Sequence, residues 1–72
     1  MKLPRDVSGP QAVKALCRLG FEREHQEGSH IRLARGRLRV SVPNHRTLAP
    51  KTLQSILRQA EILLPKFTNA LL

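Results

Sequence analysis

The stretch SHIRLARGRLRVSV, residues 29–42, decides the fold because apolar and polar residues alternate in it on both sides of a short break. Ile31 and Leu33 alternate with polar residues before Arg35-Gly36, and aliphatic residues alternate with polar ones again after it. A period of two is typical of a half-buried strand, and a short break containing glycine is typical of a hairpin turn. The sequence therefore predicts a β-hairpin with one aliphatic face and one basic face.

A two-residue turn at Arg35-Gly36 predicts how the hairpin pairs: Leu33 with Leu38, and Arg32 with Arg39. Like charges directly opposite each other destabilise a sheet by a few tenths to about 1 kcal/mol, so this pair suggests an anion between the arginines. The alternative is an ordinary solvated face on which the long side chains splay apart. The polar face then carries His30, Arg32, Arg37, Arg39 and Ser41.

A helical pattern precedes the hairpin. Residues 8–11, Ser-Gly-Pro-Gln, have the N-cap, first-turn proline and capping-box glutamine of a helix start. We expect a helix over residues 9–19 that stops at Gly20, with Phe21 folded back onto Leu16. Residues 21–26 then form a weak exposed or edge strand. The apolar stripe of the helix consists of Ala12, Val13, Leu16 and Cys17.

A second helical pattern follows the hairpin. Pro43 cannot donate to a ladder and ends the last strand, and a helix should begin at Thr47 or Ala49 with Pro50 in its first turn. The tail, residues 61–72, carries more apolar residues than a solvated end needs, which suits a short third helix or a docking segment. The buried stripe of the second helix consists of Leu53, Ile56, Leu57 and Ala60.

These elements run in the order helix, three antiparallel strands, helix, which predicts an α+β fold of order αβββα. Both helices must cover the aliphatic face of the sheet, because their apolar stripes can be buried nowhere else. A chain of 72 residues with 40% hydrophobic content fits one domain, residues 1–72, with a single thin core.

The strong positive charge of the chain indicates what kind of partner it binds. Residues 28–60 contain no Asp or Glu but include two histidines, and the whole chain has a formal net charge of +8. A segment that cannot neutralise its own charge is expected to face a polyanion, and we interpret it as a surface directed at RNA. An anionic membrane surface and an acidic protein are the other classes that charge allows. The basic residues of this segment are Arg32, Arg35, Arg37, Arg39, Arg46, Lys51 and Arg58.

The cysteine count and the spacing of histidines and acids argue against disulfides and metal sites. Cys17 is the only cysteine, which excludes an intramolecular disulfide and a cysteine-based zinc site and fits a reducing compartment, with the cytoplasm as the expected location. On the stripe of the first helix it should be an inert core thiol. The three histidines and the acids lack metal-ligand spacing, so no metal or cofactor is expected. No apolar run approaches a membrane span or a signal peptide.

Five continuous motifs occur along the chain: LPRDVSG (3–9), LGF (19–21), GSHIRL (28–33), VSVPNH (40–45) and KTLQSILRQA (51–60). Taken together, they closely resemble those of the HicA-type mRNA interferase toxins. The resemblance implies a fold like the double-stranded-RNA-binding domain, ribonuclease activity that arrests translation, and a HicB-type antitoxin as inhibitor. It also implies that His30 is catalytic. Lys51 and Glu61 stand where members commonly have glycine, so the ends of the second helix are expected to differ locally.

The chemistry of RNA suits these residues. Its own 2'-hydroxyl attacks the adjacent phosphorus once a base removes the proton, and a histidine that titrates near neutrality can be that base or the acid. Arginines bind phosphate in a bidentate way and offset developing charge, and a lysine near a helix start adds a backbone contact. Ser29 is expected to position or bind RNA rather than act as a nucleophile. The expected RNA-binding residues are Ser29, Arg32, Arg37, Arg39 and Lys51.

The second acid or base of such a reaction is unassigned. His45 is a candidate supporting residue, although a histidine after Pro-Asn is more often a turn or capping group, and His25 is expected at the surface. One alternative is a noncatalytic RNA-binding module that uses the same face, which the absence of Trp and Tyr weakens. Another is a protein-binding domain with an acidic partner. Substitution of His30 distinguishes an enzyme from a binding module, because an enzyme loses activity while it keeps binding, whereas a binding module loses little.

Overall fold

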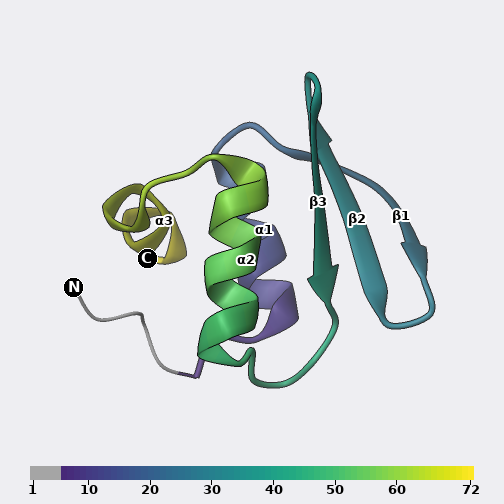
Figure 1. The fold of residues 1–72 in the computed structure, drawn as a ribbon, viewed down its shortest axis with the longest axis horizontal. Coiled ribbons are helices and arrows are strands. Elements are labelled where there is room, and N and C mark those ends of the chain that lie inside the picture. Colours follow the sequence, from purple (N-terminus) through teal and green to yellow (C-terminus); the bar gives the residue numbers. More distant parts are fainter. Residues whose placement is uncertain (1–5) are drawn as a thin grey trace.

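The chain forms the predicted helix, three strands and helix, followed by a third helix (Figure 1). The computed structural model describes residues 6–72, so residues 3–5 of the opening motif lie outside the described residues. The strands form one antiparallel sheet of order β1-β2-β3, which confirms the α+β class and the αβββα order. The elements are α1 (Gly9–Arg18), β1 (Glu22–Glu27), β2 (His30–Arg35), β3 (Leu38–Pro43), α2 (Pro50–Ala60) and α3 (Leu64–Leu71).

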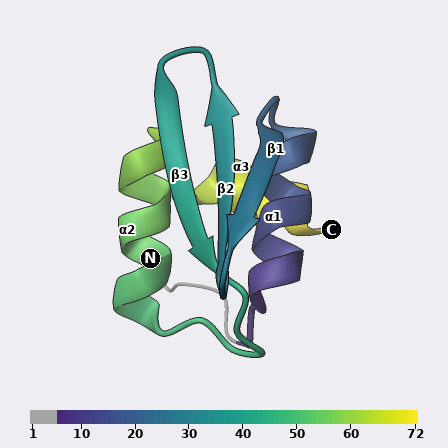
Figure 2. The same cartoon turned by 90° about the vertical axis from the view of Figure 1, so that its right-hand side faces the viewer.

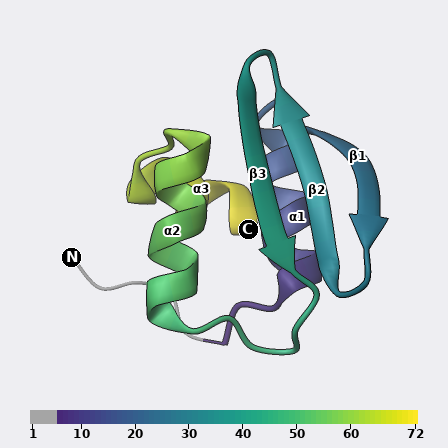
Figure 3. The same cartoon turned by 45° about the vertical axis from the view of Figure 1, so that its right-hand side comes forward.

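The first two helices cover the same face of the sheet, as their apolar stripes require. Figure 2 shows the sheet in front, with α2 along the β3 edge and α1 behind β1. Helix α1 contacts β1, β3 and α3, while α2 contacts β3. Figure 1 places α3 on the far side of the helix pair from the strands, and Figure 3 shows it behind α2. None of the helices within residues 6–72 has the length and apolar character needed to cross a membrane.

Helix α1 starts and stops as predicted. The Ser8 hydroxyl accepts from the Gln11 backbone N–H at 3.1 Å, and the Gln11 side chain accepts from the Ser8 N–H at 2.9 Å, which completes the capping box. Gly20 follows with a φ of 102°, which glycine adopts without steric cost. The Phe21 N–H then donates to the Leu16 carbonyl at 3.0 Å, so the chain turns back onto the helix as it enters β1.

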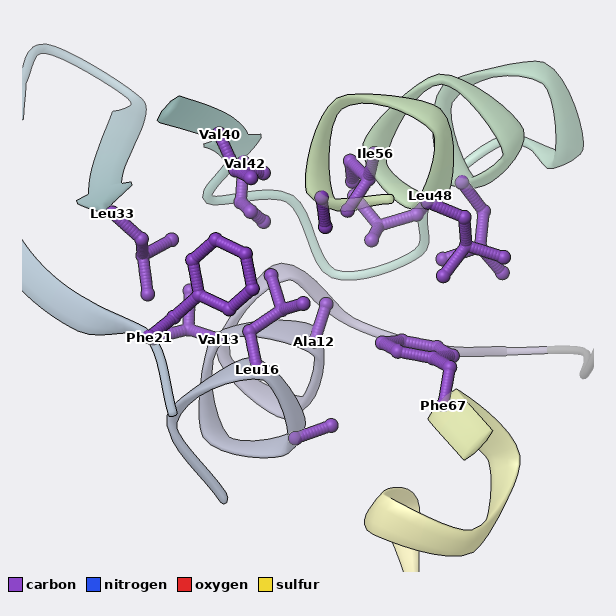
Figure 4. Close-up of a cluster of buried hydrophobic side chains, with 14 of the residues drawn as sticks. Ala12, Val13, Leu16, Phe21, Leu33, Val40, Val42, Leu48, Ile56 and Phe67 are labelled. Carbon is purple, nitrogen blue, oxygen red and sulfur yellow. The ribbon is translucent and has the colours of Figure 1, made fainter. Parts of the chain in front are cut away.

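One apolar core lies between the sheet and the helices (Figure 4). The aliphatic face of the hairpin and the stripe of α2 are buried as predicted. Phe67 of α3 is completely buried in the same core, and the sequence did not single it out. The tail is therefore a structural helix. The buried hairpin and α2 side chains are Ile31, Leu33, Val40, Val42, Leu53, Ile56, Leu57 and Ala60.

The prediction that Cys17 is buried is wrong, because its side chain is exposed. Ala15 is 1% exposed and takes its place in the buried arc of α1. Helix α3 packs against α1, and Ala15 of α1 and Ala70 of α3 line the same cleft between the two helices. Since each residue advances about 100° around a helix, a buried arc that extends to Ala15 leaves Cys17 outside it.

The predicted register of the hairpin is also wrong, by two residues. The turn is Gly36-Arg37, with a φ of 59° at Gly36, and Arg35 pairs with Leu38. This register places glycine at the first central position of the turn, where a two-residue hairpin loop favours it. A shift of two keeps every side chain on its predicted face. Arg32 now lies opposite Ser41, so the argument for an anion between Arg32 and Arg39 no longer holds.

Helix α2 begins as predicted, with Ala49 as N-cap and Pro50 as its first residue. It ends at Ala60, and its C-cap, Glu61, has left-handed backbone angles of φ 54° and ψ 44°. A non-glycine residue pays a steric cost in this conformation. The Ile62 N–H donates to the Leu57 carbonyl at 3.1 Å and closes the helix end, after which the chain turns into α3.

Candidate functional site

His30 is the first residue of β2 and lies on the polar face of the hairpin. The Gly28-Ser29 turn precedes it, and Gly28 has a positive φ of 56°. The side chain is exposed, and its Nδ1 lies 3.5 Å from the Ser41 hydroxyl on β3. The ring is therefore accessible to a ligand while one of its nitrogens faces a polar group of the neighbouring strand.

His30 lines a groove of about 380 Å³ between the end of the hairpin and α2. This volume is at the lower end of the range for ligand sites. Most of the lining residues have polar side chains, and the His30 imidazole is the one aromatic ring among them, so bound bases would be held mainly by hydrogen bonds and charge. The groove residues are His30, Ser41, Pro43, Lys51, Thr52, Ser55, Ile56 and Gln59.

Gln59 joins the helical wall of the groove to the strand wall. Its Oε1 accepts from the backbone N–H of Ser41 at 3.1 Å, and its Nε2 donates to the Ser55 hydroxyl at 3.2 Å. Strand β3 is an edge strand, and Gln59 satisfies one of the N–H groups that such an edge leaves free. The sequence did not predict this contact.

The N-terminus of α2 forms one end of the groove. Within the described residues, no side chain caps this helix, because the N-cap is Ala49. The first N–H groups of a helix lack partners inside it and favour negative charge. Lys51 and Thr52 lie in this first turn and also line the groove. The predicted RNA-binding residue Lys51 and the predicted catalytic residue His30 therefore border the same groove.

The arginines of the hairpin face are partly neutralised by acids of β1. Arg32 Nε lies 4.0 Å from Glu27 Oε1, and Arg39 Nε lies 3.7 Å from Glu24 Oε1. A side-chain hydrogen bond from His25, and then the charge of Arg32, lower the pKa of Glu27. The outer face is therefore less strongly basic than the sequence of the hairpin alone suggests.

The structure separates the predicted phosphate-binding arginines along the hairpin. Arg37 lies in the turn, at the end of the strands opposite to His30, about 17 Å away along β2. Arg39 lies opposite Ala34, about 13 Å along the strand from His30, and also donates to the Gly36 carbonyl at 3.0 Å. Arg32 is two residues from His30 on the same face. Of the three, Arg32 is the nearest to His30.

The remaining candidates lie around the base of the hairpin. The Ser29 carbonyl accepts from the Asn44 N–H, which ties the turn before His30 to the chain after β3. His45 accepts from the Gly9 N–H through its carbonyl at 2.8 Å, while its exposed side chain lies outside the groove residues. His25 Nε2 lies 3.1 Å from Glu27 Oε1 on the exposed β1 strand. The structure does not bring His45 or His25 into the groove.

The groove combines one imidazole, one ammonium group and the free N–H groups of a helix end. Such an arrangement can bind a phosphate and move a proton beside it. Across residues 6–72, no three His, Cys, Asp or Glu side chains gather in a way that could hold a metal ion.

A family model described as "HicA toxin of bacterial toxin-antitoxin" matches residues 9–62, which include the first two helices and the whole sheet. No curated protein matches the chain. The matched region contains every residue of the groove and ends before α3.

Proposed function

Because the chain belongs to the HicA toxin family of bacterial toxin-antitoxin systems, we propose that it is an endoribonuclease that cleaves mRNA without a metal ion. The observation that carries this proposal is the position of His30 in a groove shared with Lys51 and the start of α2. A proton-transferring group and groups that attract phosphate border the same space. Cleavage of mRNA would arrest translation and account for toxicity.

His30 is the group that moves a proton. As a base it takes the proton from the 2'-hydroxyl of the RNA, whose oxygen then forms a bond to the adjacent phosphorus. The bond between phosphorus and the 5' oxygen breaks, and that oxygen receives a proton. The products are a cyclic phosphate and a free 5'-hydroxyl, with no net change in oxidation state. His30 can equally be the acid that protonates the leaving oxygen, and the partner group is a water molecule or an RNA group.

The start of α2 holds the phosphate that reacts. The Lys51 ammonium and the free N–H groups of the first turn stabilise the charge that develops on the phosphate oxygens. Arg32 and Ser29 contact the RNA backbone next to His30. Arg39 and Arg37 lie farther along the hairpin and bind phosphates of the neighbouring nucleotides, which gives affinity but contributes little to the chemical step.

Membership of the family implies an antitoxin partner, and we propose a HicB-type antitoxin that covers the groove at His30. A net charge of +8 favours an acidic surface on this partner. Binding would exclude RNA and would also stabilise a small domain through linkage. Purified complex that cuts RNA as fast as the free toxin would overturn this masking role.

The test is cleavage of a defined RNA in excess EDTA by the wild type and by His30→Ala, with folding compared by circular dichroism. We expect the wild type to cut and the folded variant to lose cutting while it still binds RNA. Equal cutting by both proteins would reject His30 as the catalytic residue. Binding of RNA without cutting by the wild type would favour the alternative, a noncatalytic RNA-binding module.

A further inference from the structure

A chain of polar contacts connects His30 to the second helix. His30 Nδ1 lies 3.5 Å from Ser41 Oγ, and the backbone N–H of Ser41 donates to Gln59 Oε1 at 3.1 Å. Gln59 Nε2 donates to Ser55 Oγ at 3.2 Å. The contacts cross from β2 through β3 to α2, and all four residues line the groove.

We propose that Ser41 and Gln59 are positioning residues that hold the His30 ring with Nδ1 toward β3 and Nε2 toward the groove. This inference rests on the proposed ribonuclease function and names the residues that orient its catalytic group. A neutral imidazole carries its proton on one nitrogen, and the hydrogen bond of the other nitrogen decides which. We assign Nδ1–H as the donor to the Ser41 hydroxyl, which lies 3.5 Å away, and this assignment leaves Nε2 with a free lone pair to take the proton of the 2'-hydroxyl.

Gln59 is suited to this role because both ends of its amide are engaged. Its oxygen binds the strand and its nitrogen binds the helix, so neither end can rotate without loss of a hydrogen bond. The helix itself is anchored by Ile56 and Ala60, each 1% exposed, on either side of Gln59 in the sequence. A rigid helix thus fixes the backbone of Ser41, and with it the hydroxyl that faces His30.

Glu27 is the competing candidate for the group that orients His30, since it is the cross-strand neighbour of His30 on β1. Its Oε1 lies 3.1 Å from His25 Nε2 and 4.0 Å from Arg32 Nε. These contacts engage the carboxylate with His25 and Arg32. Ser41 is the side chain that contacts the His30 ring itself.

The kinetic test compares Gln59→Ala, Gln59→Glu and the control Gln54→Ala, an exposed glutamine of α2 outside the groove. We expect Gln59→Ala to lower kcat about 10- to 100-fold, as a misplacement near 1 Å does, with little change in KM. Glutamate keeps the acceptor for the Ser41 N–H but repels RNA, so Gln59→Glu should keep kcat and raise KM. The proposal is overturned if Gln59→Ala keeps the kcat of the wild type, whether its KM is unchanged or raised.

A second measurement does not depend on cleavage. The ¹⁵N shifts of the His30 ring nitrogens report which nitrogen carries the proton. We expect the Nδ1–H form in the wild type and a mixture of both forms in Ser41→Ala and Gln59→Ala, with wild-type spectra elsewhere. If the ¹⁵N shifts of the His30 ring are the same in both variants as in the wild type, the positioning role of Ser41 and Gln59 is overturned, even if the protein cuts RNA. If the wild type cuts no RNA, the ribonuclease function fails, while the ring shifts still decide whether Ser41 and Gln59 orient His30.

Discussion

Gly9 and Pro43 approach so closely that a Cβ on Gly9 would overlap the carbonyl oxygen of Pro43. The first residue of α1 thus packs directly on the chain that leaves β3. The Gly9 N–H also donates to the His45 carbonyl at 2.8 Å. This approach fixes the end of the hairpin beside the groove.

Gly9→Ala should therefore destabilise the protein by about 1–3 kcal/mol, the usual cost of an overpacked site. Alanine is the better helix former, so propensity alone predicts the opposite sign. Urea unfolding measures the change in the free energy of unfolding. Gly28→Ala, at a positive φ but in open space, shows for comparison the cost of an alanine that overlaps no other atom. Stability of Gly9→Ala equal to or above that of the wild type would contradict the close approach.

Glu61→Gly should stabilise the protein by about 1 kcal/mol, because Glu61 occupies the left-handed region at the end of α2. For a domain of this size the melting temperature should rise by about 4–8 °C. Glu61→Ala removes the same carboxylate and keeps the backbone penalty, so it is the matched control. A gain in Glu61→Ala as large as that in Glu61→Gly would show that charge, and not backbone conformation, causes the effect.

Phe67→Ala should cost about 3–5 kcal/mol, because the ring is completely buried between α3 and the rest of the core. A loss of this size can unfold a chain of 72 residues. Phe67→Leu is a milder variant that should still lower stability more than a substitution at an exposed position does. The neighbouring Leu63 is 79% exposed, and Leu63→Ala should change stability by less than about 0.5 kcal/mol. Equal melting curves for Phe67→Leu and Leu63→Ala would refute a structural role for α3.

The carboxylate of Glu27 should make stability depend on pH. The hydrogen bond from His25 and the charge of Arg32 lower the pKa of Glu27 from an ordinary value of 4.5. The stabilising effect of the carboxylate is therefore present above pH 4.5 and is lost as the pH falls through the lowered pKa. The free energy of unfolding of Glu27→Gln should therefore be lower than that of the wild type above pH 4.5, and the two values should converge as the pH falls through the lowered pKa.

An NMR titration separates the two causes of the shift at Glu27. In His25→Ala the pKa of Glu27 should rise toward its ordinary value, because the side-chain hydrogen bond is the largest contribution. In Arg32→Met the rise should be smaller. An unchanged pKa of Glu27 in His25→Ala would mean that the contact between the two β1 side chains does not form in solution.

Local sequence patterns were sufficient to predict the order of the helices and strands and the buried face of the hairpin. The capping box at Ser8 and the stop at Gly20 involve residues only a few positions apart, so the sequence contains all their partners. The two-residue period around Ile31 and Leu33 determines which side chains are buried. The resemblance to HicA toxins rests on such continuous motifs and agrees with the family match.

Only the tertiary structure decided the register of the hairpin and the partners of its polar residues. A shift of two residues leaves the period unchanged, so the alternation could not distinguish a turn at Arg35-Gly36 from one at Gly36-Arg37. The neutralisation of Arg39 by Glu24 depends on how β1 pairs with the hairpin. These partners are distant in the sequence, and only the folded chain brings them together.

The sequence by itself determined the αβββα order and the buried faces of the hairpin and of α2, because each follows from residues that are neighbours along the chain. The motif around His30 made it the catalytic candidate through the resemblance to HicA toxins. The tertiary structure decided what surrounds His30: a groove against α2, with Lys51 at one end and Gln59 bound to β3. It also exposed Cys17 and buried Phe67, since the packing of α3 on α1 sets the limits of the core. Periodicity shows which side of an element is covered, but the identity of the covering residues depends on contacts between distant segments.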